Sequence, residues 1–243
     1  MNRILFKAEE IGEKGTVRLS GARAKHVLEV LHGKPGQKIR IGVVDGNQGG
    51  GMIEEAGKGF VMLRCALDGE VPPVPMVDLL LAMPRPKVMK RLWAQITAMG
   101  VGRVVVVNAE KVERNYFDTK WLEQEHYEPL LIEGLTQCGD TRLPQVLVRR
   151  RLKVFVEDEM DKMFPESSRF LCHPGGVPAV EALRSRREGR VLIAIGPEGG
   201  WTEFELNMLE SHGFVRIGMG KRLLRSDTAC VSMLALVHGV MAD

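Results

Sequence analysis

Hydrophobic and polar residues follow different patterns in the two parts of the chain. Up to about residue 70 the apolar runs are short and separated by turns. In one run Ile39, Ile41 and Val43 recur at every second position, which is typical of a strand with one buried face. A helix capped by Ser20 is expected from Gly21 to about Leu31. Short strands separated by turns predict a small β-barrel.

A proline-rich segment follows, with three prolines in the five residues Val71–Pro75. Proline fixes its own backbone angle and lacks an N–H donor, so this segment is expected to form neither a helix nor a central strand. It predicts a linker. We therefore divide the chain into a β-rich domain, residues 1–72, and a second domain, residues 73–243.

Beyond the linker, buried strands alternate with helices. Met76–Ala82 is a nearly continuous apolar run, as expected of a parallel strand that is covered on both faces. A helix to about Gly100 and a strand at Arg103–Val107 complete a β–α–β unit. This alternation predicts an α/β fold with a mostly parallel sheet. Later elements are expected as helices at 119–137, where Pro129 opens the second half, at 154–163 and at 178–187, and as a strand at 169–172.

The carboxyl-terminal part of the chain contains two β–α units that each carry a glycine-rich turn. The first runs from Val191 to Thr202 and the second from Ile217 to Ala229. Glycines at the carboxyl edge of a strand let a ligand approach the backbone, and the next helix offers free N–H donors. Ligands of open α/β sheets bind at this edge. Because the turns carry Glu198, Arg225 and Asp227, we expect a binding cleft there.

Helix-capping signals accompany both turns. Thr202–Glu205 has the sequence of a capping box, so a helix is expected to begin directly after Gly200. Its apolar residues Phe204, Leu206 and Leu209 are expected to dock it on the sheet. Ser226 or Asp227 can cap the last helix, and the sequence leaves open whether Asp227 is a cap or a catalytic group.

Composition and charge narrow the class of protein. The 243 residues are 27% charged and 44% hydrophobic, values typical of a soluble globular protein. No apolar stretch approaches the length of a membrane span, and the start of the chain turns acidic too early for a signal peptide. We therefore expect a cytoplasmic protein without a membrane partner. The net charge of +3 does not decide whether nucleic acid is a partner.

Basic residues nevertheless gather in four places along the sequence. Such clusters are usually solvated faces, but each could contact phosphates. The last one is the most suggestive because it lies inside a glycine-rich segment. The clusters are Arg85/Lys87/Lys90/Arg91, Arg149/Arg150/Arg151/Lys153, Arg184/Arg186/Arg187/Arg190 and Lys221/Arg222/Arg225.

Several kinds of site find no support in the sequence. The four cysteines are far apart, and neither they nor the six histidines show the close spacing of zinc ligands, so we expect no metal. Cys172 and Cys230 are expected to be small buried residues. The Walker loop, the dinucleotide-binding pattern and the nucleophile elbow are missing. A different nucleotide in the glycine-rich cleft remains an alternative.

The two closing motifs carry a resemblance. Ile195–Thr202 (IGPEGGWT) and Gly220–Ala229 (GKRLLRSDTA) resemble the RsmE family of the SPOUT superfamily, which methylates N3 of a uridine in 16S ribosomal RNA. Leu171–Pro174 (LCHP) and Gln137–Gly139 (QCG) with Arg142 support it. The resemblance covers the whole chain.

The resemblance implies a fold, a cofactor and partners. It implies a PUA-like RNA-binding β-barrel followed by an α/β domain with a deep trefoil knot. It further implies that S-adenosylmethionine binds in the knot, that the protein is a homodimer, and that 16S ribosomal RNA or the small ribosomal subunit is the substrate. Neither a metal nor a membrane is implied.

The resemblance also assigns residues. The catalytic candidates are Arg225, which could hold the uracil oxygens or a phosphate, and Asp227 and Glu198, either of which could assist proton removal from N3. The expected RNA contacts are Lys25, Arg85, Lys87, Arg91, Arg142 and Arg225. The expected cofactor contacts are Leu171, His173, Ile195, Gly196, Pro197, Glu198, Gly199, Gly200, Met219, Gly220, Leu223, Leu224, Thr228 and Ala229.

Several residues depart from the family pattern, and three of these departures bear on function. Gln95 stands where lysine is common, Ala98 where glutamate is typical, and Asp140 where arginine is common. These departures concern RNA contacts rather than the cofactor site. They suggest two alternatives to the expected enzyme: an RNA-binding protein without catalysis, or a methyltransferase with a shifted RNA target.

Overall fold

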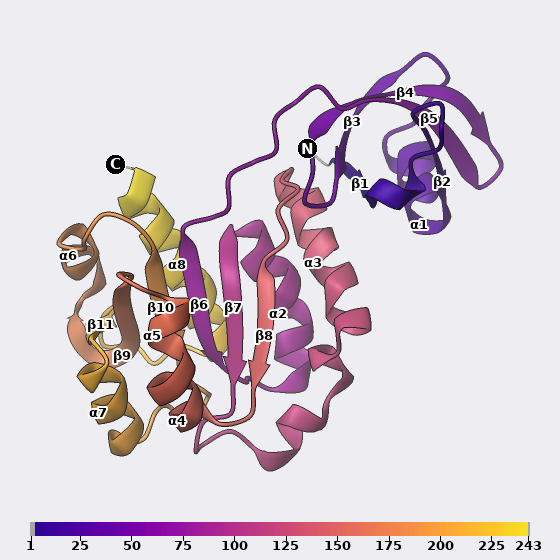
Figure 1. The fold of residues 1–243 in the computed structure, drawn as a ribbon. Helices are drawn as coiled ribbons and strands as arrows, with labels where there is room; N and C mark the ends of the chain where they lie inside the picture. Colours follow the sequence, from indigo (N-terminus) through magenta and orange to yellow (C-terminus); the bar gives the residue numbers. More distant parts are fainter. Residues whose placement is uncertain (1–2, 243) are drawn as a thin grey trace. The chain divides into compact units, whose positions relative to one another are not determined.

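The structure is a computed structural model that describes residues 3–242 (Figure 1). The chain divides into two compact units. One contains the chain up to Val74 together with Ile132–Leu143, and the other contains Pro75–Leu131 and the chain from Pro144 onward. The sequence had suggested no role for residues 132–143 in the first unit.

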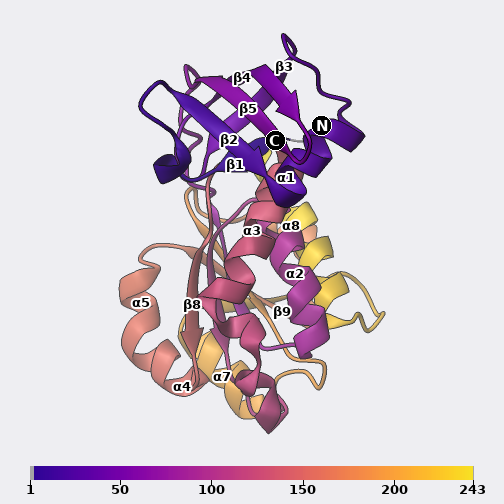
Figure 2. The same cartoon turned by 90° about the vertical axis from the view of Figure 1, so that its right-hand side faces the viewer.

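The first unit is built on a five-stranded sheet with the order β1-β3-β4-β5-β2. Strands β1 and β3 are parallel, and the other neighbours are antiparallel. A bulge in β4 accompanies the curl of the sheet (Figure 2). Because the described pairing leaves β1 and β2 at its two ends, the closed PUA-like barrel stays a prediction. The strands are β1 (Ile4–Phe6), β2 (Thr16–Ser20), β3 (Lys38–Val43), β4 (Gln48–Gly57) and β5 (Phe60–Ala66).

The alternating pattern of β3 is confirmed by burial. Ile39, Ile41 and Val43 all lie in the core of the first unit. The expected helix from Gly21 begins as α1 (Gly21–Lys25) and continues as a π-helical turn to Val30.

Residues after helix α3 (Gln124–Cys138) pack on the same unit through polar contacts. Arg3 Nε donates to the carbonyl of Gly139 at 2.9 Å, and Thr141 Oγ1 donates to the carbonyl of Gly46 at 2.8 Å. Asp140 Oδ1 accepts from the backbone N–H groups of Thr141 and Arg142. The carboxylate of Asp140 therefore closes a turn, which gives this departure from the family pattern a structural role.

The second unit contains a six-stranded sheet with the order β11-β9-β10-β6-β7-β8, in which all neighbours are parallel. Every residue of β6 and β10 is buried, as the continuous apolar runs predict. The mostly parallel sheet predicted from the sequence is thus confirmed. Its strands are β6 (Val77–Ala82), β7 (Val101–Val107), β8 (Gln145–Arg149), β9 (Ser168–Pro178), β10 (Val191–Ile195) and β11 (Phe214–Gly218).

Helices cover both faces of this sheet. Helices α2 and α8 pack on each other, and together with α3 they lie on the face opposite α4 and α5 (Figures 1 and 2). The chain returns from the edge strand β11 to form α8, which contacts the central strands β6 and β10. The trefoil knot implied by the resemblance would lie where the chain makes this return, and it stays a prediction. The helices of this unit are α2 (Pro86–Ala98), α4 (Leu152–Val154), α5 (Met160–Met163), α6 (Ala179–Arg184), α7 (Glu203–Ser211) and α8 (Ser226–Ala242), with α3 shared between the units.

Two sequence-based boundaries are wrong. Pro129 does not open a second half-helix but lies inside α3, near its beginning. The helix expected from residue 154 begins at Leu152 and passes through a π-helical turn between α4 and α5. Pro129 is the sixth residue of α3, beyond the first turn, so its missing N–H removes one hydrogen bond within the helix. Within residues 3–242, none of the helices has the length and apolar character needed to cross a membrane.

A buried ion pair joins the starts of two central strands. Asp78 in β6 is fully buried, and its carboxylate receives two hydrogen bonds from the Arg190 guanidinium, with Nε to Oδ2 at 2.8 Å. Arg190 also donates to the carbonyl of Pro75 at 3.0 Å. Arg190 therefore serves the fold, although the sequence places it in a basic cluster.

We expect Arg190→Ala to lower the free energy of unfolding by about 3–5 kcal/mol, because it leaves the buried Asp78 carboxylate without a counter-charge. Urea unfolding followed by circular dichroism measures this. The double variant Asp78→Ala/Arg190→Ala should lose less than Arg190→Ala alone. Equal losses in both variants would contradict this interpretation, and Arg187→Ala, at an exposed arginine, provides the charge control.

Candidate active site

A cavity of about 390 Å³ lies at the carboxyl edge of β9, β10 and β11. Because the strands are parallel, the loops that follow them meet at one edge of the sheet. Three loops and the start of α8 enclose the cavity. Its lining consists of Lys111, Cys172, His173, Pro174, Ile195, Gly196, Pro197, Glu198, Gly199, Gly200, Trp201, Ile217, Gly218, Met219, Gly220, Arg222, Leu223, Leu224, Ser226, Ala229 and Met233.

The first loop is a wide bulge within β9. Leu171 pairs with Arg216 and Val177 pairs with Ile217, so the residues between Leu171 and Val177 form an insertion opposite a single step of β11. At Gly176 an added Cβ would lie 2.5 Å from the backbone of Ile217, so the two strands meet only because this residue is glycine. The expected strand at 169–172 is therefore longer than predicted, and its bulge presents Cys172, His173 and Pro174 to the cavity.

The second loop runs from Gly196 to Trp201 and ends in the predicted capping box. Thr202 Oγ1 accepts from the N–H of Glu205 at 3.3 Å, while Glu205 Oε2 accepts from the N–H of Thr202 at 2.8 Å. Both halves of the box are present, so the prediction is confirmed. Gly200 has φ 69°, a left-handed conformation that favours glycine.

Lys111, which follows β7, fixes the same loop from the side. Its Nζ donates to the carbonyl oxygens of Gly199 at 3.1 Å and Trp201 at 3.4 Å. Sequence reasoning missed this residue. Lys111 lies a few residues after a parallel strand, at the same edge of the sheet, and this position could have indicated a role in the site.

The third loop connects β11 to α8. Met219, Gly220, Leu223 and Leu224 line the cavity, and Leu223 is 83% exposed. The Arg225 side chain is exposed and has no polar partner within residues 3–242. It is therefore available for an external anion or a carbonyl oxygen.

Glu198 and Asp227 both contact the amino-terminal half of α2, including its capping residue. Glu198 Oε1 accepts from the backbone N–H of Arg85 at 3.1 Å, which satisfies a donor at the helix start. Asp227 Oδ2 forms an ion pair with Arg91 at 3.1 Å, and its Oδ1 accepts from the N–H of Thr228 at 2.9 Å. Glu198 lines the cavity, whereas Asp227 lies beside it at the first turn of α8.

Two buried polar atoms at the cavity have no partner in the described part of the chain. These are the indole Nε1 of Trp201 and the hydroxyl of Ser226, and each residue is only 5% exposed. Buried polar groups are nearly always hydrogen-bonded, and an unpaired one costs about 1–3 kcal/mol. A polar ligand in the cavity would satisfy both atoms, so the lining fits a ligand with several hydrogen-bonding groups.

Most of the residues predicted to contact a cofactor line this cavity. Leu171 and Thr228 do not: Leu171 is fully buried in β9, and Thr228 is exposed on α8. No separate sequence signal identifies Trp201 and Ser226 as polar lining residues. The predicted residues found in the lining are His173, Ile195, Gly196, Pro197, Glu198, Gly199, Gly200, Met219, Gly220, Leu223, Leu224 and Ala229.

The chain is similar to RNA methyltransferases. The model of the RNA methyltransferase domain matches residues 71–238, which is more than half of the chain. Ribosomal RNA small subunit methyltransferase E from Treponema pallidum is 30% identical over 98% of this chain and 90% of its own length. The chain belongs to this RNA methyltransferase family.

Two solved structures share the fold. The methyltransferase E of Neisseria gonorrhoeae bound to S-adenosyl methionine has a TM-score of 0.75 at 22% identity, covering 99% of this chain and 98% of that one. A putative methyltransferase of Legionella pneumophila with bound cofactor SAM has a TM-score of 0.75 at 23% identity and covers 98% and 97%. The methyltransferase fold therefore extends over both units of the chain.

The residues predicted to contact RNA in this methyltransferase are spread over both units. Lys25, Arg85, Lys87 and Arg91 are exposed, and Lys25 pairs with Glu29 at 3.8 Å on the surface of the first unit. Arg142 differs, because its Nε donates to the carbonyl of Pro72 at 2.6 Å. Arg142 therefore holds the segment after α3 to the proline-rich linker.

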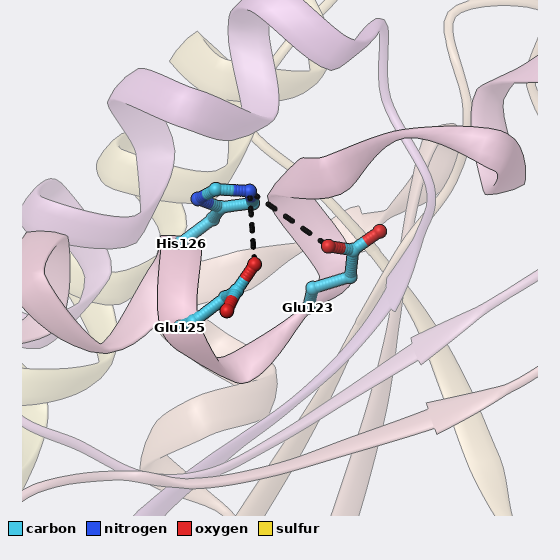
Figure 3. A group of neighbouring side chains, drawn as sticks. All are labelled: Glu123, Glu125 and His126. Carbon is cyan, nitrogen blue, oxygen red and sulfur yellow. Dashed lines mark ion pairs between the residues drawn. The ribbon is translucent and has the colours of Figure 1, made fainter.

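A group of possible metal ligands lies at the start of α3 rather than in the cavity. The imidazole Nε2 of His126 pairs with Glu125 at 3.4 Å and with Glu123 at 3.7 Å, on an exposed surface (Figure 3). Cations are disfavoured at a helix N-terminus by the helix dipole. We interpret the group as a surface ion-pair cluster, and the expectation of no metal stays a prediction.

The cysteines differ in their surroundings. Cys230 is buried in α8, and burial raises its pKa to about 12. Burial also raises the pKa of Cys172, at the cavity. The structure confirms that Cys230 is buried, whereas Cys172 is partly buried at the cavity and Cys138 is exposed.

We expect iodoacetamide at neutral pH to modify Cys138 first and Cys230 slowest. Burial raises the pKa of all four thiols, which slows each because only the thiolate reacts, but Cys138 is exposed to the reagent whereas Cys230 is buried in α8. Peptide mass spectrometry measures the four rates, and protein unfolded in urea is the control in which all cysteines react alike. Equal rates for Cys138 and Cys230 in the folded protein would contradict the structure.

Proposed function

We propose that this methyltransferase transfers a methyl group from S-adenosylmethionine to N3 of a uridine in 16S ribosomal RNA. The observation that supports this most is the cavity itself, in which three glycine-rich loops leave backbone groups and two unpartnered polar atoms facing the interior. Gln95 and Ala98, where the chain departs from the family pattern, do not line it. Because these departures lie outside the cavity, they leave its lining intact, which favours a catalytic protein over an RNA-binding relative without activity.

The cavity fits the proposed cofactor chemically. Ser226 and Trp201 can donate hydrogen bonds to the polar groups of an adenosine and an amino acid, and Leu223 and Leu224 supply apolar surface for a ring. Gly218 allows the close approach of the third loop to the bulge of β9, since an added Cβ would lie 2.9 Å from the carbonyl of His173. S-adenosylmethionine supplies an electrophilic methyl group on a sulfonium, so the protein's main task is alignment.

Arg225 is the residue proposed to hold the uracil. Its guanidinium lies at the end of the third loop, one residue before α8, and is free to donate to the uracil oxygens. As N3 loses its proton, negative charge develops on the ring, and a nearby cation stabilises it. Asp227 and Glu198 are the candidates to accept that proton. Comparison of Asp227→Asn with Glu198→Gln, each in a pH profile of methylation, distinguishes the two carboxylates.

The assembly proposed for the enzyme is a homodimer with a knotted second unit and a PUA-like first unit that contacts RNA. The exposure of Leu223 and Leu224 beside the cavity supports association there, because large apolar side chains are usually covered. Light scattering of the purified chain gives the molecular mass directly. A monomer at all concentrations would contradict this part of the proposal.

The decisive experiment maps methylated uridines in 16S ribosomal RNA from cells with and without the gene for this chain. We expect one N3-methyluridine to disappear with the gene and return when it is restored. In vitro, the purified chain should methylate naked 16S RNA or the small subunit, and a comparison of the two identifies the substrate. An unchanged methylation map would reject the proposed function.

Arg225→Ala should lower the rate of methylation at least tenfold, which corresponds to about 1.4 kcal/mol of transition-state stabilisation. Folding and cofactor affinity should stay close to those of the parent protein, since the side chain has no polar partner in the described structure. Radiolabelled methyl transfer and calorimetry with S-adenosylmethionine measure the two effects. Arg184→Ala, at an exposed arginine of α6, is the matched control, and an unaltered rate in Arg225→Ala would remove Arg225 from the mechanism.

Lys111→Ala should weaken cofactor binding about fivefold, because about 1 kcal/mol of hydrogen bonding that fixes the second loop is lost. Calorimetry measures the affinity. Lys87→Ala removes the same charge from an exposed position of α2 and should bind the cofactor normally. If both variants bind alike, Lys111 does not position the loop.

A further inference from the structure

A second cavity, of about 890 Å³, lies in the same unit and belongs to no part of the site described so far. It is lined by residues that follow β7, residues that follow β8 and the first turns of α7, so it opens at the same carboxyl edge of the sheet. Glu110 and Val112 line it, while Lys111 between them lines the first cavity. One loop therefore forms a wall of both cavities.

The lining is rich in cations. Arg114, Arg150, Arg151 and Lys153 line the cavity, and all four are exposed. The side chains of Arg114 and Arg151 have no partner in the chain from residue 3 to 242. The other two form long surface pairs, Arg150 with Asp118 at 3.7 Å and Lys153 with Glu157 at 3.8 Å, and the Arg150 guanidinium also lies 5.8 Å from the centre of the Phe117 ring. Such pairs contribute little, so these cations can bind an anion.

The carboxylates of the lining do not neutralise these cations. Glu205 is only 5% exposed, and its two oxygens accept hydrogen bonds from Thr202 and from the backbone of Glu110. Glu110 is the remaining acid of the lining, against four basic side chains. The cavity therefore favours a ligand with several negative charges.

An exposed aromatic ring lies in the same lining. The sequence pattern predicted that Phe204 would dock α7, and this is wrong: Leu206 and Leu209 are buried, whereas Phe204 is 61% exposed. Phe204 stands in the first turn of α7, on the side that faces the cavity instead of the core. An exposed aromatic ring beside cations is the arrangement that binds unpaired nucleotides, with bases stacked on the ring and phosphates held by Arg or Lys.

A buried acceptor completes the set. The side-chain oxygen Oδ1 of Asn108, at the end of β7, is buried without a hydrogen-bond partner in the described structure. Asn108 also lines this cavity. A ribose hydroxyl or an exocyclic amino group is a donor that could satisfy it.

We propose that this second cavity binds a single-stranded RNA segment, with Phe204 stacking on a base and with Arg114, Arg151 and Lys153 contacting its phosphates. The identification of that segment as a flank of the methylated uridine rests on the proposed function. The loop at Lys111 contributes residues to both cavities, so the two cavities are neighbours along one edge of the sheet.

The test uses the full chain and a fluorescent single-stranded oligoribonucleotide of about ten nucleotides, whose binding is measured by anisotropy at several salt concentrations. Arg114→Ala/Arg151→Ala should weaken binding at least tenfold and reduce the slope of log affinity against log salt by about 1.4, since each phosphate contact on a single strand contributes about 0.7. Arg184→Ala/Arg187→Ala removes the same charge from α6 and the loop after it, and should leave both quantities nearly unchanged.

Phe204→Ala should weaken binding at least fivefold without changing the salt slope, and Phe204→Trp should restore it, because stacking involves no counterion. A loss of fold would change the circular dichroism and is thereby separated from a loss of contact. Wild-type affinity in both the arginine pair and Phe204→Ala would overturn the proposal. An equal loss of RNA affinity in the α6 control pair would also overturn the proposal. If the cavity variants bind polyglutamate more weakly while their RNA affinity is unchanged, the cavity binds an acidic protein instead.

The outcome is distinguishable from a failure of the proposed function. Cofactor binding and methyl transfer are measured on the same variants. Absence of methylation by the wild-type chain, with the RNA affinities as expected, would reject the proposed reaction and keep the RNA site. Methylation with unaltered RNA affinity in all variants would reject the RNA site alone.

Discussion

The arrangement of the second unit's functional edge depends on the buried carboxylate of Glu205. Its Oε2 accepts from the backbone N–H and the hydroxyl of Thr202, and its Oε1 accepts from the N–H of Glu110 at 2.8 Å. A carboxylate removed from water is tolerated only when hydrogen bonds replace its hydration. One side chain thereby joins the start of α7, the loop after β10 and the loop after β7. The loop that carries Lys111 and the loop that carries Trp201 are held together, and each contributes to the lining of the first cavity.

Helix α2 supplies the second anchor of that edge. Glu198 of the loop after β10 accepts from the backbone at the start of α2, and Asp227 at the start of α8 pairs with Arg91 in the second turn of α2. The basic residues at the start of α2 oppose the helix dipole, which is unfavourable without a compensating partner. Asp227 compensates Arg91, and Lys90 lies over the ring of Trp121 with its Nζ 4.8 Å from the ring centroid. Two of the catalytic candidates therefore also have structural contacts.

The sequence predicted those elements that depend on interactions between residues close together in the chain. The alternation in β3, the continuous runs of β6 and β10 and the capping box at Thr202 each depend on neighbours within a few residues, and all are present. The bulge of β9 depends on how Gly176 meets Ile217 in a distant strand, and the direction of Phe204 depends on the loops that surround it. The placement of residues 132–143 with the first unit is likewise a long-range outcome, made by contacts such as Arg3 with Gly139. Such pairings have no signature in a single stretch of sequence.

The basic residues show most clearly that long-range contacts cannot be predicted from local sequence. In the sequence the four clusters look alike, but the structure separates cations that hold the fold from cations that face solvent. Arg190 neutralises the buried Asp78, and Arg149 pairs with Glu159 at 2.7 Å, whereas Arg151 and Arg225 have no polar partner in the described chain. Paired arginines have already lost their counterions to the protein, so they add little to phosphate binding, while free ones gain from releasing counterions. The small net charge of +3 therefore understates the capacity for RNA binding, because it counts both kinds equally.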